Sequence, residues 1–312
     1  MRDLIFLVAP LLATTFAKAS QHPASSGDDS KKYGRVSETE YVLTPAQISN
    51  FFNAGLATLP DLLTPSEMDY IESVFDKFLS REIPVPGKDF CDMSKPFGTP
   101  FEQWSIVNCM LPTRYYPPFQ NNIYEMLTQS ITRQLFPTKN MTKDYDQFLN
   151  KRPGKNDAVF AWHQDMAYWP GPKALGVSDT STITFSLAVD DSVEENGCLK
   201  YVRGSGVQKT LRPHRPLGKS RDDAHALVTS VGGDDDVEFA PCPRGSATIH
   251  DEYVVHGSGG NLMEDRQRRT YVLAYRAGEI VEAERGIGFT HSHNDDVNWD
   301  TFEDGQKRSN EL

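Results

Sequence analysis

The stretch from Phe160 to Trp169 reads FAWHQDMAYW and places two metal-ligating residue types, His163 and Asp165, on either side of Gln164. Its first three residues are the end of the apolar run 158–162, and the length and composition of that run are typical of a short buried strand. Residues two apart in a strand point to the same face, so this imidazole and this carboxylate would share one side of a sheet. His-x-Asp alone is usually a hydrogen-bonded pair, so a metal site needs support from the rest of the chain.

Further short β-prone runs follow, separated by Gly, Pro and Asp. Beyond AVFAW (158–162) they are TITFSLAV (182–189), CLKYV (198–202), SATIH (246–250) and TYVLAY (270–275). There is no alternation of strands with helices and no internal repeat. The pattern predicts a mainly β protein with flanking helices and a sandwich or barrel at its core. The charged, Gly- and Pro-rich residues 203–236 predict a long excursion over one end of the sheet.

A facial iron site needs a second imidazole from another strand. The best candidate is His256, in VVHGSGGN, and its rival is His250, in TIHDE. We favour His256 because a Gly-Ser pair and then three arginines follow it. An arginine that enters the barrel can hold a dicarboxylate through a two-pronged salt bridge.

Three blocks of this sequence together resemble the phytanoyl-CoA dioxygenase family of iron(II)- and 2-oxoglutarate-dependent oxygenases. They are WHQDMAYW (162–169), EENGCLKYVRGSG (194–206), and HGSGGN with its downstream arginine pair (256–269). The resemblance spans about Tyr41 to Ala277. It implies a double-stranded β-helix, the jelly-roll or cupin-like core, and a site in which His163, Asp165 and His256 are the metal ligands for Fe²⁺ and therefore the catalytic residues.

The resemblance also implies residues for the cosubstrate 2-oxoglutarate. Arg268 would bind its distal carboxylate, with Ser258 beside that carboxylate and Gln147 at a weaker contact. The loop before the arginines has one extra residue, which leaves Arg266 as an alternative to Arg268. Ser186 stands where many members have tryptophan, so the cosubstrate pocket is expected to differ there.

The implied reaction is that of a dioxygenase that uses O₂ and 2-oxoglutarate to hydroxylate, or otherwise oxidise, an unactivated C–H bond of a small-molecule substrate, releasing succinate and CO₂. Asp165 favours hydroxylation or desaturation over halogenation, because halogenating relatives have a small residue there. One alternative is a catalytically inactive relative that only binds a small molecule, which the complete ligand set disfavours. The other is a jelly-roll metalloenzyme that does not use 2-oxoglutarate and would not need the arginine.

The composition narrows the class of partner. A formal net charge of −11 over 312 residues argues against nucleic acid as the main partner. No internal run approaches the roughly 20 apolar residues of a membrane span. Four cysteines are few for a disulfide scaffold, although Cys91 and Cys109 are a candidate pair.

The N-terminal region has the layout of a secretory signal peptide. An apolar stretch is followed by Ala17-Lys18-Ala19, a small-x-small cleavage site. We therefore predict a signal peptide at 1–19 and a location in the secretory pathway or outside the cell; the alternative is a cytoplasmic or organellar protein. The polar residues 20–40 predict a flexible linker.

The oxygenase domain is predicted over residues 41–290. Within it, Thr64-Pro65-Ser66-Glu67 predicts a helix start, with apolar residues at helical spacing through Phe78. A second helix is predicted over 121–136. Residues 291–312 predict an acidic tail, which would leave the pair His291 and His293 in solvent.

Overall fold

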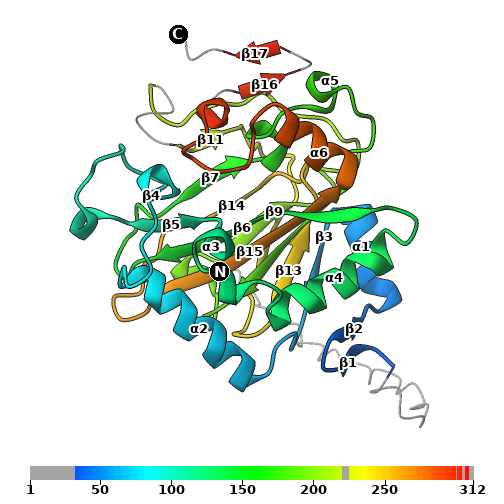
Figure 1. The fold of residues 1–312 in the computed structure, drawn as a ribbon, viewed down its shortest axis with the longest axis horizontal. Helices are drawn as coiled ribbons and strands as arrows, with labels where there is room; N and C mark the ends of the chain where they lie inside the picture. Colours follow the sequence, from blue (N-terminus) through cyan, green and yellow to red (C-terminus); the bar gives the residue numbers. More distant parts are fainter. Residues whose placement is uncertain (1–31, 220–224, 300, 304–305, 309–312) are drawn as a thin grey trace, which may run out of the picture.

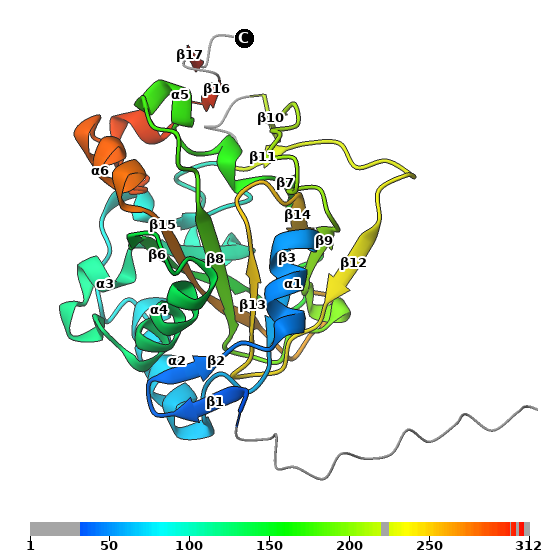
Figure 2. The ribbon, with the colours of Figure 1, turned by 90° about the vertical axis from the view of Figure 1, so that its right-hand side faces the viewer.

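The structure, a computed structural model, describes residues 32–219, 225–299, 301–303 and 306–308. Two antiparallel sheets face each other (Figures 1 and 2). The larger has the order β3 (Leu56–Leu59), β13 (Ala247–His250), β8 (Thr182–Ala188), β15 (Arg268–Ala277), β6 (Met141–Lys151), β5 (Ile106–Met110) and β4 (Phe90–Asp92). The smaller has the order β12 (Val237–Ala240), β9 (Leu199–Val202), β14 (His256–Ser258) and β7 (Phe160–His163). This is the predicted mainly β, jelly-roll core.

Helices cover the outer face of the larger sheet: α1 (Pro45–Ala54), α2 (Pro65–Leu79) and α4 (Ile123–Leu135). Thr64 caps α2 as predicted, because its side chain accepts from the Glu67 backbone while the Glu67 side chain accepts from the Thr64 backbone. The apolar stripes of α2 and α4 lie in the main hydrophobic core. Since these helices close one face of the sheet, its other face is left for the site.

Strand β15 shows how one sequence serves both faces. Tyr271, Leu273 and Tyr275 belong to the core beneath the helices. Arg268, Thr270 and Val272, the residues between them, line a cavity between the two sheets. The period of two along a strand produces this division. Arg269 therefore points away from the cavity, whereas Arg268 points into it.

Folded structure begins earlier than the sequence predicts. Within the region predicted as a linker, β1 (Gly34–Ser37) pairs with β2 (Glu40–Val42) in a hairpin. Arg35 ties this hairpin to the start of α2, since its guanidinium donates to the Leu62 carbonyl and the Glu67 carboxylate. The hairpin depends on these distant partners and has little apolar pattern of its own. Residues 20–31 and the predicted signal peptide lie outside the described residues.

The prediction that His291 and His293 lie in a solvated tail is wrong. Both side chains are buried and line the cavity between the sheets. The segment follows α6 (Gly278–Gly286) and is held by two buried carboxylates. Asp89 accepts from the Ser292 hydroxyl and the His293 backbone, and Asp144 accepts from the His291 ring at 2.7 Å. Packed structure thus continues at least through residue 293.

The candidate pair Cys91 and Cys109 forms no disulfide, because all four cysteines are free and buried. In the β4–β5 ladder Cys91 lies opposite Asn108 and Cys109 opposite Phe90, so the two thiols point to opposite faces of the sheet.

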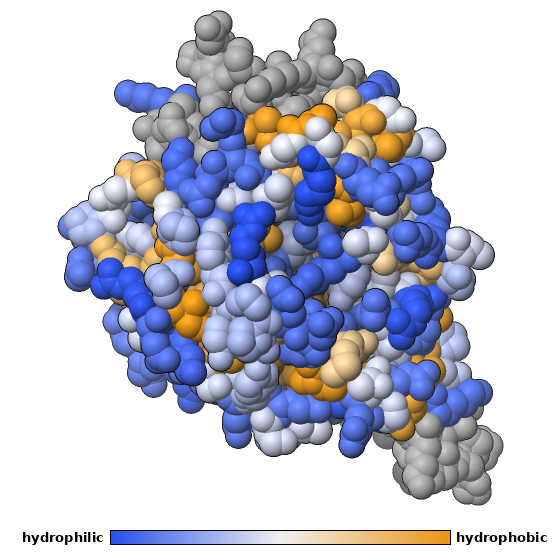
Figure 3. Space-filling model, viewed as in Figure 1, coloured by the Kyte–Doolittle hydropathy of each residue, from blue (hydrophilic) through white to orange (hydrophobic). Residues whose placement is uncertain are grey.

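The excursion 203–236 contains the short pair β10 (Arg215–Pro216) and β11 (Leu227–Val228). Other short elements are α3 (Pro112–Tyr115), α5 (Pro172–Leu175), β16 (Thr301–Glu303) and β17 (Gln306–Arg308). No helix in the described ranges is long and apolar enough to cross a membrane. The face shown in Figure 3 is mostly hydrophilic, with its apolar residues in separate small groups.

Candidate metal and cosubstrate site

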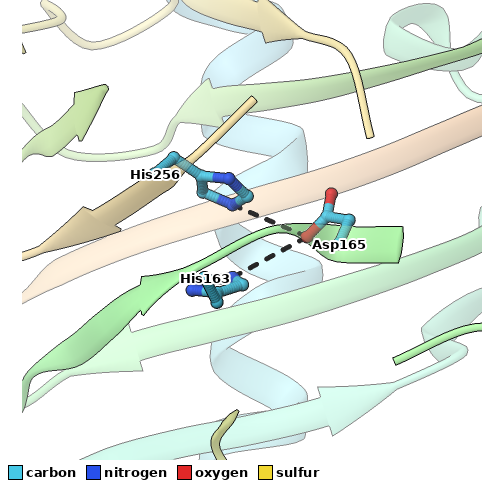
Figure 4. Close-up of side chains that lie close together, drawn as sticks. All are labelled: His163, Asp165 and His256. Atoms are coloured by element: carbon cyan, nitrogen blue, oxygen red, sulfur yellow. Dashed lines mark ion pairs between the residues drawn. The ribbon is translucent and has the colours of Figure 1, made fainter. Parts of the chain in front are cut away.

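The candidate metal ligands meet where β7 and β14 lie side by side (Figure 4). His163 is the last residue of β7 and pairs directly with His256, the first residue of β14. Gln164 continues the extended backbone, with φ −119° and ψ 135°, and Asp165 begins a 3₁₀ turn. One extended residue separates His163 from Asp165, so their side chains reach the same side, as the sequence predicts.

Gln164 fixes this local backbone from the opposite side. Its amide group donates to the carbonyls of Tyr253 and Thr210 and accepts from the Arg212 backbone. Its side chain is fully buried. These three bonds satisfy the buried amide, and the bonds to Thr210 and Arg212 hold the His-Gln-Asp triplet against the excursion 203–236.

The three side chains are close enough to share one ion. The Nε2 atoms of His163 and His256 lie 3.7 and 3.5 Å from Asp165 Oδ1, and the two ring centroids are 4.2 Å apart. One ligand atom from each residue falls within 4.8 Å of the others. Two imidazoles and a carboxylate on one side of an ion are the donor set of non-haem iron(II) oxygenases.

Hydrogen bonds prepare both imidazoles to bind a metal. Nδ1 of His163 lies 2.7 Å from the Ala161 carbonyl, and Nδ1 of His256 lies 2.9 Å from the Val254 carbonyl. A carbonyl oxygen only accepts, so both rings carry a proton on Nδ1 and turn the lone pair of Nε2 toward Asp165. Burial lowers the pKa of both rings, which keeps them neutral. Two converging lone pairs beside a carboxylate fit a cation.

His250, the rival ligand, lies behind the site. Its Nε2 is 3.3 Å from Asp165 Oδ2, the oxygen not used by the other two histidines, and the Thr184 hydroxyl donates to the same oxygen. Burial alone would raise the pKa of Asp165, but His256 and His250 outweigh it and hold that pKa well below its usual range. The carboxylate is therefore ionised and oriented.

Arg268 lines the same cavity as the three candidate ligands. Its side chain is only 4% exposed and bonds through Nε to the Ser192 hydroxyl at 3.3 Å, yet it forms no salt bridge within the described part of the chain. A buried guanidinium without a carboxylate is costly unless a ligand supplies one. The rival Arg266 is exposed in the preceding loop. The geometry thus fits Arg268 to the distal carboxylate of 2-oxoglutarate.

A second buried basic side chain, which the sequence analysis missed, lies beside Arg268. Lys151 is its direct partner in the β15–β6 ladder, and its ammonium donates to the Ser258 hydroxyl at 2.6 Å and to the Gly259 carbonyl. Burial and the neighbouring Arg268 lower the pKa of Lys151 well below its usual value. Gln147, on the same strand, lines the cavity and donates to Asn108. The position of Lys151 near the end of a buried strand is the feature of the sequence that could have indicated its role.

Asp144, Glu284 and His291 form another cluster with metal-ligand spacing. Two arginines already occupy it: Arg276 contacts both carboxylates, and Arg285 bonds to Asp144 at 2.5 Å. These cations balance the carboxylates, so the cluster is a buried charge network rather than a metal site.

The fold and the site define the class first: a jelly-roll protein with two histidines and an aspartate at one end of its barrel. Comparison with known proteins gives the family. The phytanoyl-CoA dioxygenase (PhyH) family matches residues 51–270, and the chain belongs to that family.

Its curated relatives include L-proline trans-4-hydroxylase of Streptomyces griseoviridis, 27% identical over 145 residues. That match covers 41% of this chain and 52% of the relative. 2-Aminoethylphosphonate dioxygenase of an uncultured bacterium is 30% identical over 139 residues, covering 45% of this chain and 46% of the relative. The matches thus span about half the length of these relatives.

Solved structures share the fold. EvdO2 from Micromonospora carbonacea, complexed with 2-oxoglutarate, superposes with a TM-score of 0.60 at 24% identity, covering 76% of this chain and 91% of that one. EctD from S. alaskensis with bound Fe gives a TM-score of 0.57 at 15% identity, covering 76% and 78%.

Proposed function

We propose that this protein is an Fe(II)- and 2-oxoglutarate-dependent dioxygenase that hydroxylates, or otherwise oxidises, an unactivated C–H bond of a small molecule. The supporting observation is the placement of an unpaired buried arginine, Arg268, in the cavity where His163, Asp165 and His256 converge. The relatives named above as a hydroxylase and a dioxygenase support the same reaction class.

In this proposal His163, Asp165 and His256 hold the metal from one side and leave its other side open to the cavity. Bound iron(II) and 2-oxoglutarate would supply the reductive activation of O₂, with succinate and CO₂ as the products of the cosubstrate. Arg268 orients 2-oxoglutarate through its distal carboxylate. Ser258, which Lys151 holds by a hydrogen bond, lies near the same end.

The rest of the cavity wall has a large apolar part. Apolar side chains from both sheets line it, among them Met110, Leu149, Phe160, Leu199 and Val272. In such surroundings the charge interactions of Asp165 and Arg268 are stronger than in water.

Oxygen uptake and succinate formation, measured with and without iron(II) and 2-oxoglutarate, test the proposal. We expect slow turnover that needs both additions, even without substrate. His163→Ala and His256→Ala should each abolish it, while Arg266→Ala, a change in an exposed loop, should not. Metal-dependent oxygen uptake without any need for 2-oxoglutarate would favour a different jelly-roll metalloenzyme. Failure to bind iron would favour an inactive small-molecule-binding relative.

A further inference from the structure

Aromatic and imidazole rings form the part of the cavity that the metal and 2-oxoglutarate do not use. The ring-bearing residues there include Tyr145, Tyr168, Trp169, Phe289, His291 and His293. Phe289, His291 and His293 come from the segment after α6 and line the cavity. This wall lines the same cavity as the candidate metal ligands, so a substrate bound in that cavity would contact it.

The described wall carries very little charge. Apart from histidines, its ionisable acidic and basic side chains are Asp165 and Arg268. The proposed function assigns the first to the metal and the second to 2-oxoglutarate. A substrate ammonium would find no remaining carboxylate on this wall, and a substrate carboxylate would find no remaining guanidinium or ammonium. Burying either charge unpaired is unfavourable.

His291 offers this wall a hydrogen-bond acceptor. Its Nε2 lies 2.7 Å from Asp144 Oδ2. The hydrogen bond from His291 and the positive charges of Arg276 and Arg285 outweigh the burial of Asp144 and hold the pKa of that carboxyl well below its usual range, so the imidazole donates the bond. Burial outweighs Asp144 and lowers the pKa of His291, which favours the neutral ring. The proton is then on Nε2 and the lone pair on Nδ1.

Nδ1 of His291 forms no hydrogen bond with any described residue, although the side chain is only 4% exposed and lines the cavity. Rings hold the imidazole in place: the centroids of Tyr145, Phe289 and Trp169 lie 4.4, 4.7 and 5.7 Å from it. The guanidinium of Arg276 packs on Trp169 at 4.5 Å. A fixed acceptor beside the rings of Tyr145, Trp169 and Phe289 suits a ligand that brings one donor on a largely apolar body.

We infer that the cavity binds an uncharged substrate, an apolar ring or chain bearing a hydroxyl group, and that His291 accepts the hydrogen bond of that hydroxyl. The inference rests on the proposed function for the roles of Asp165 and Arg268. It separates this chain from the relatives named for L-proline and 2-aminoethylphosphonate, since both of those compounds are charged at neutral pH. His291 is thus a positioning residue for the substrate.

A matched series of ligands tests, without any turnover, whether the cavity prefers uncharged ligands; this preference is called the charge rule below. The probes are trans-decahydro-2-naphthol, its methyl ether, and the carboxylate and the amine on the same bicyclic ring. Dissociation constants are measured anaerobically by ligand-observed NMR, with and without iron(II) and 2-oxoglutarate. We expect the alcohol to bind at least tenfold more tightly than the carboxylate and the amine. Equal or tighter binding of either charged probe, or no binding of the alcohol, would overturn the inference.

Variants of His291 test whether its side chain accepts the hydrogen bond of the ligand hydroxyl. The wild type should prefer the alcohol over the methyl ether by about three- to tenfold, the contribution of one hydrogen bond. His291→Phe keeps a ring and should abolish this preference, whereas His291→Asn, whose amide oxygen can occupy the place of Nδ1, should restore part of it. Thermal unfolding and iron affinity of each variant show whether the fold and the metal site are intact. A preference unchanged in folded His291→Phe contradicts the role. Binding that obeys the charge rule in a protein that does not consume 2-oxoglutarate would overturn only the proposed function.

Discussion

His250 lies 3.3 Å from Asp165, with Nε2 facing Oδ2, while His163 and His256 both approach the other oxygen of the same carboxylate. The third imidazole is therefore placed to orient the candidate ligand Asp165 and is not itself one of the three converging candidates. Tyr201 lies 3.5 Å from the far nitrogen of His250 and extends the chain of polar contacts inward. Such outer contacts orient metal ligands and are usually costly to remove.

We expect His250→Ala to weaken iron(II) binding by about 10- to 100-fold, because Asp165 loses its main orienting contact. His250→Gln, which can still donate to the carboxylate, should lose much less. Thr184→Val, which removes only the weaker hydroxyl contact, is the matched control. Anaerobic titration with iron(II) measures each affinity. Wild-type affinity in His250→Ala would show that the contact has no such role.

The cosubstrate prediction concerns Arg268. Removing one partner of a buried charge pair costs about 2–5 kcal/mol, or roughly 30- to several thousand-fold in affinity. Arg268→Ala should therefore raise the apparent constant for 2-oxoglutarate steeply and leave iron affinity nearly unchanged. Arg268→Lys should recover only part, since an ammonium cannot form the two-pronged contact.

The exposed Arg266 provides the control for that series, and Arg266→Ala should behave like the wild type. A severe effect of Arg266→Ala with a mild one of Arg268→Ala would reverse the assignment. If neither variant changes the dependence on 2-oxoglutarate, the cosubstrate proposal itself fails.

Local patterns in the sequence predict the inner strands, and they place His163 and Asp165 on one side of the backbone, as the structure does. Gln164 is extended, so the spacing of His163 and Asp165 carries over into the structure. Alternation likewise separates Arg268 from Arg269. These predictions hold because each depends on a backbone period over a few residues.

Features that depend on distant partners are not readable in the same way. Polar residues normally predict solvent, yet Asp89 and Asp144 bury His291 and His293 from about 150 to 200 positions away in the chain. The β1–β2 hairpin, which Arg35 ties to α2, also depends on distant partners. So does Lys151, whose neighbours come from other strands. The sequence contains the charges but not their pairing, which the fold determines.

Arg269, on the outer face of β15, should affect stability and not 2-oxoglutarate. Its guanidinium is nearly buried and bonds to Asp190 at 2.7 Å, to Asp76 at 2.8 Å and to Glu72. Arg269→Ala would leave three carboxylates facing one another. Because these partners are partly exposed, we expect a loss of about 1–3 kcal/mol in the free energy of unfolding. Urea unfolding measures it, and a normal constant for 2-oxoglutarate should accompany the loss.

The signal-peptide prediction concerns residues outside the described part of the chain. We propose that cleavage follows Ala19, because an apolar run precedes Ala17-Lys18-Ala19. N-terminal sequencing of the protein from its native host should find a chain that begins at Ser20. A cytosolic chain that begins at Met1 or Arg2 would contradict the secretory location.

Glu252 gives a prediction for pH. Its carboxyl group is fully buried and neither oxygen accepts a hydrogen bond from a described residue. Lys209 approaches to 3.5 Å but bonds to Asp251. Burial and the charge of Asp251 raise the pKa of Glu252 to about 8. The folded protein therefore keeps the group protonated at pH values where the unfolded chain ionises it.

The direction in which stability changes with pH follows from this difference in bound protons between the folded and unfolded states. Below about pH 4.3, the ordinary glutamate pKa, both states are protonated and the group has no effect. Between there and about pH 8 the unfolded state loses the proton first, so stability falls with rising pH by on the order of 1 kcal/mol per pH unit. Glu252→Gln cannot ionise, so its stability relative to the wild type should increase across this window and level off above it. Glu264→Gln, the same change at an exposed position, is the matched control. Urea unfolding at successive pH values measures both; a flat difference for Glu252→Gln would mean that Lys209 keeps the carboxylate ionised in the folded protein.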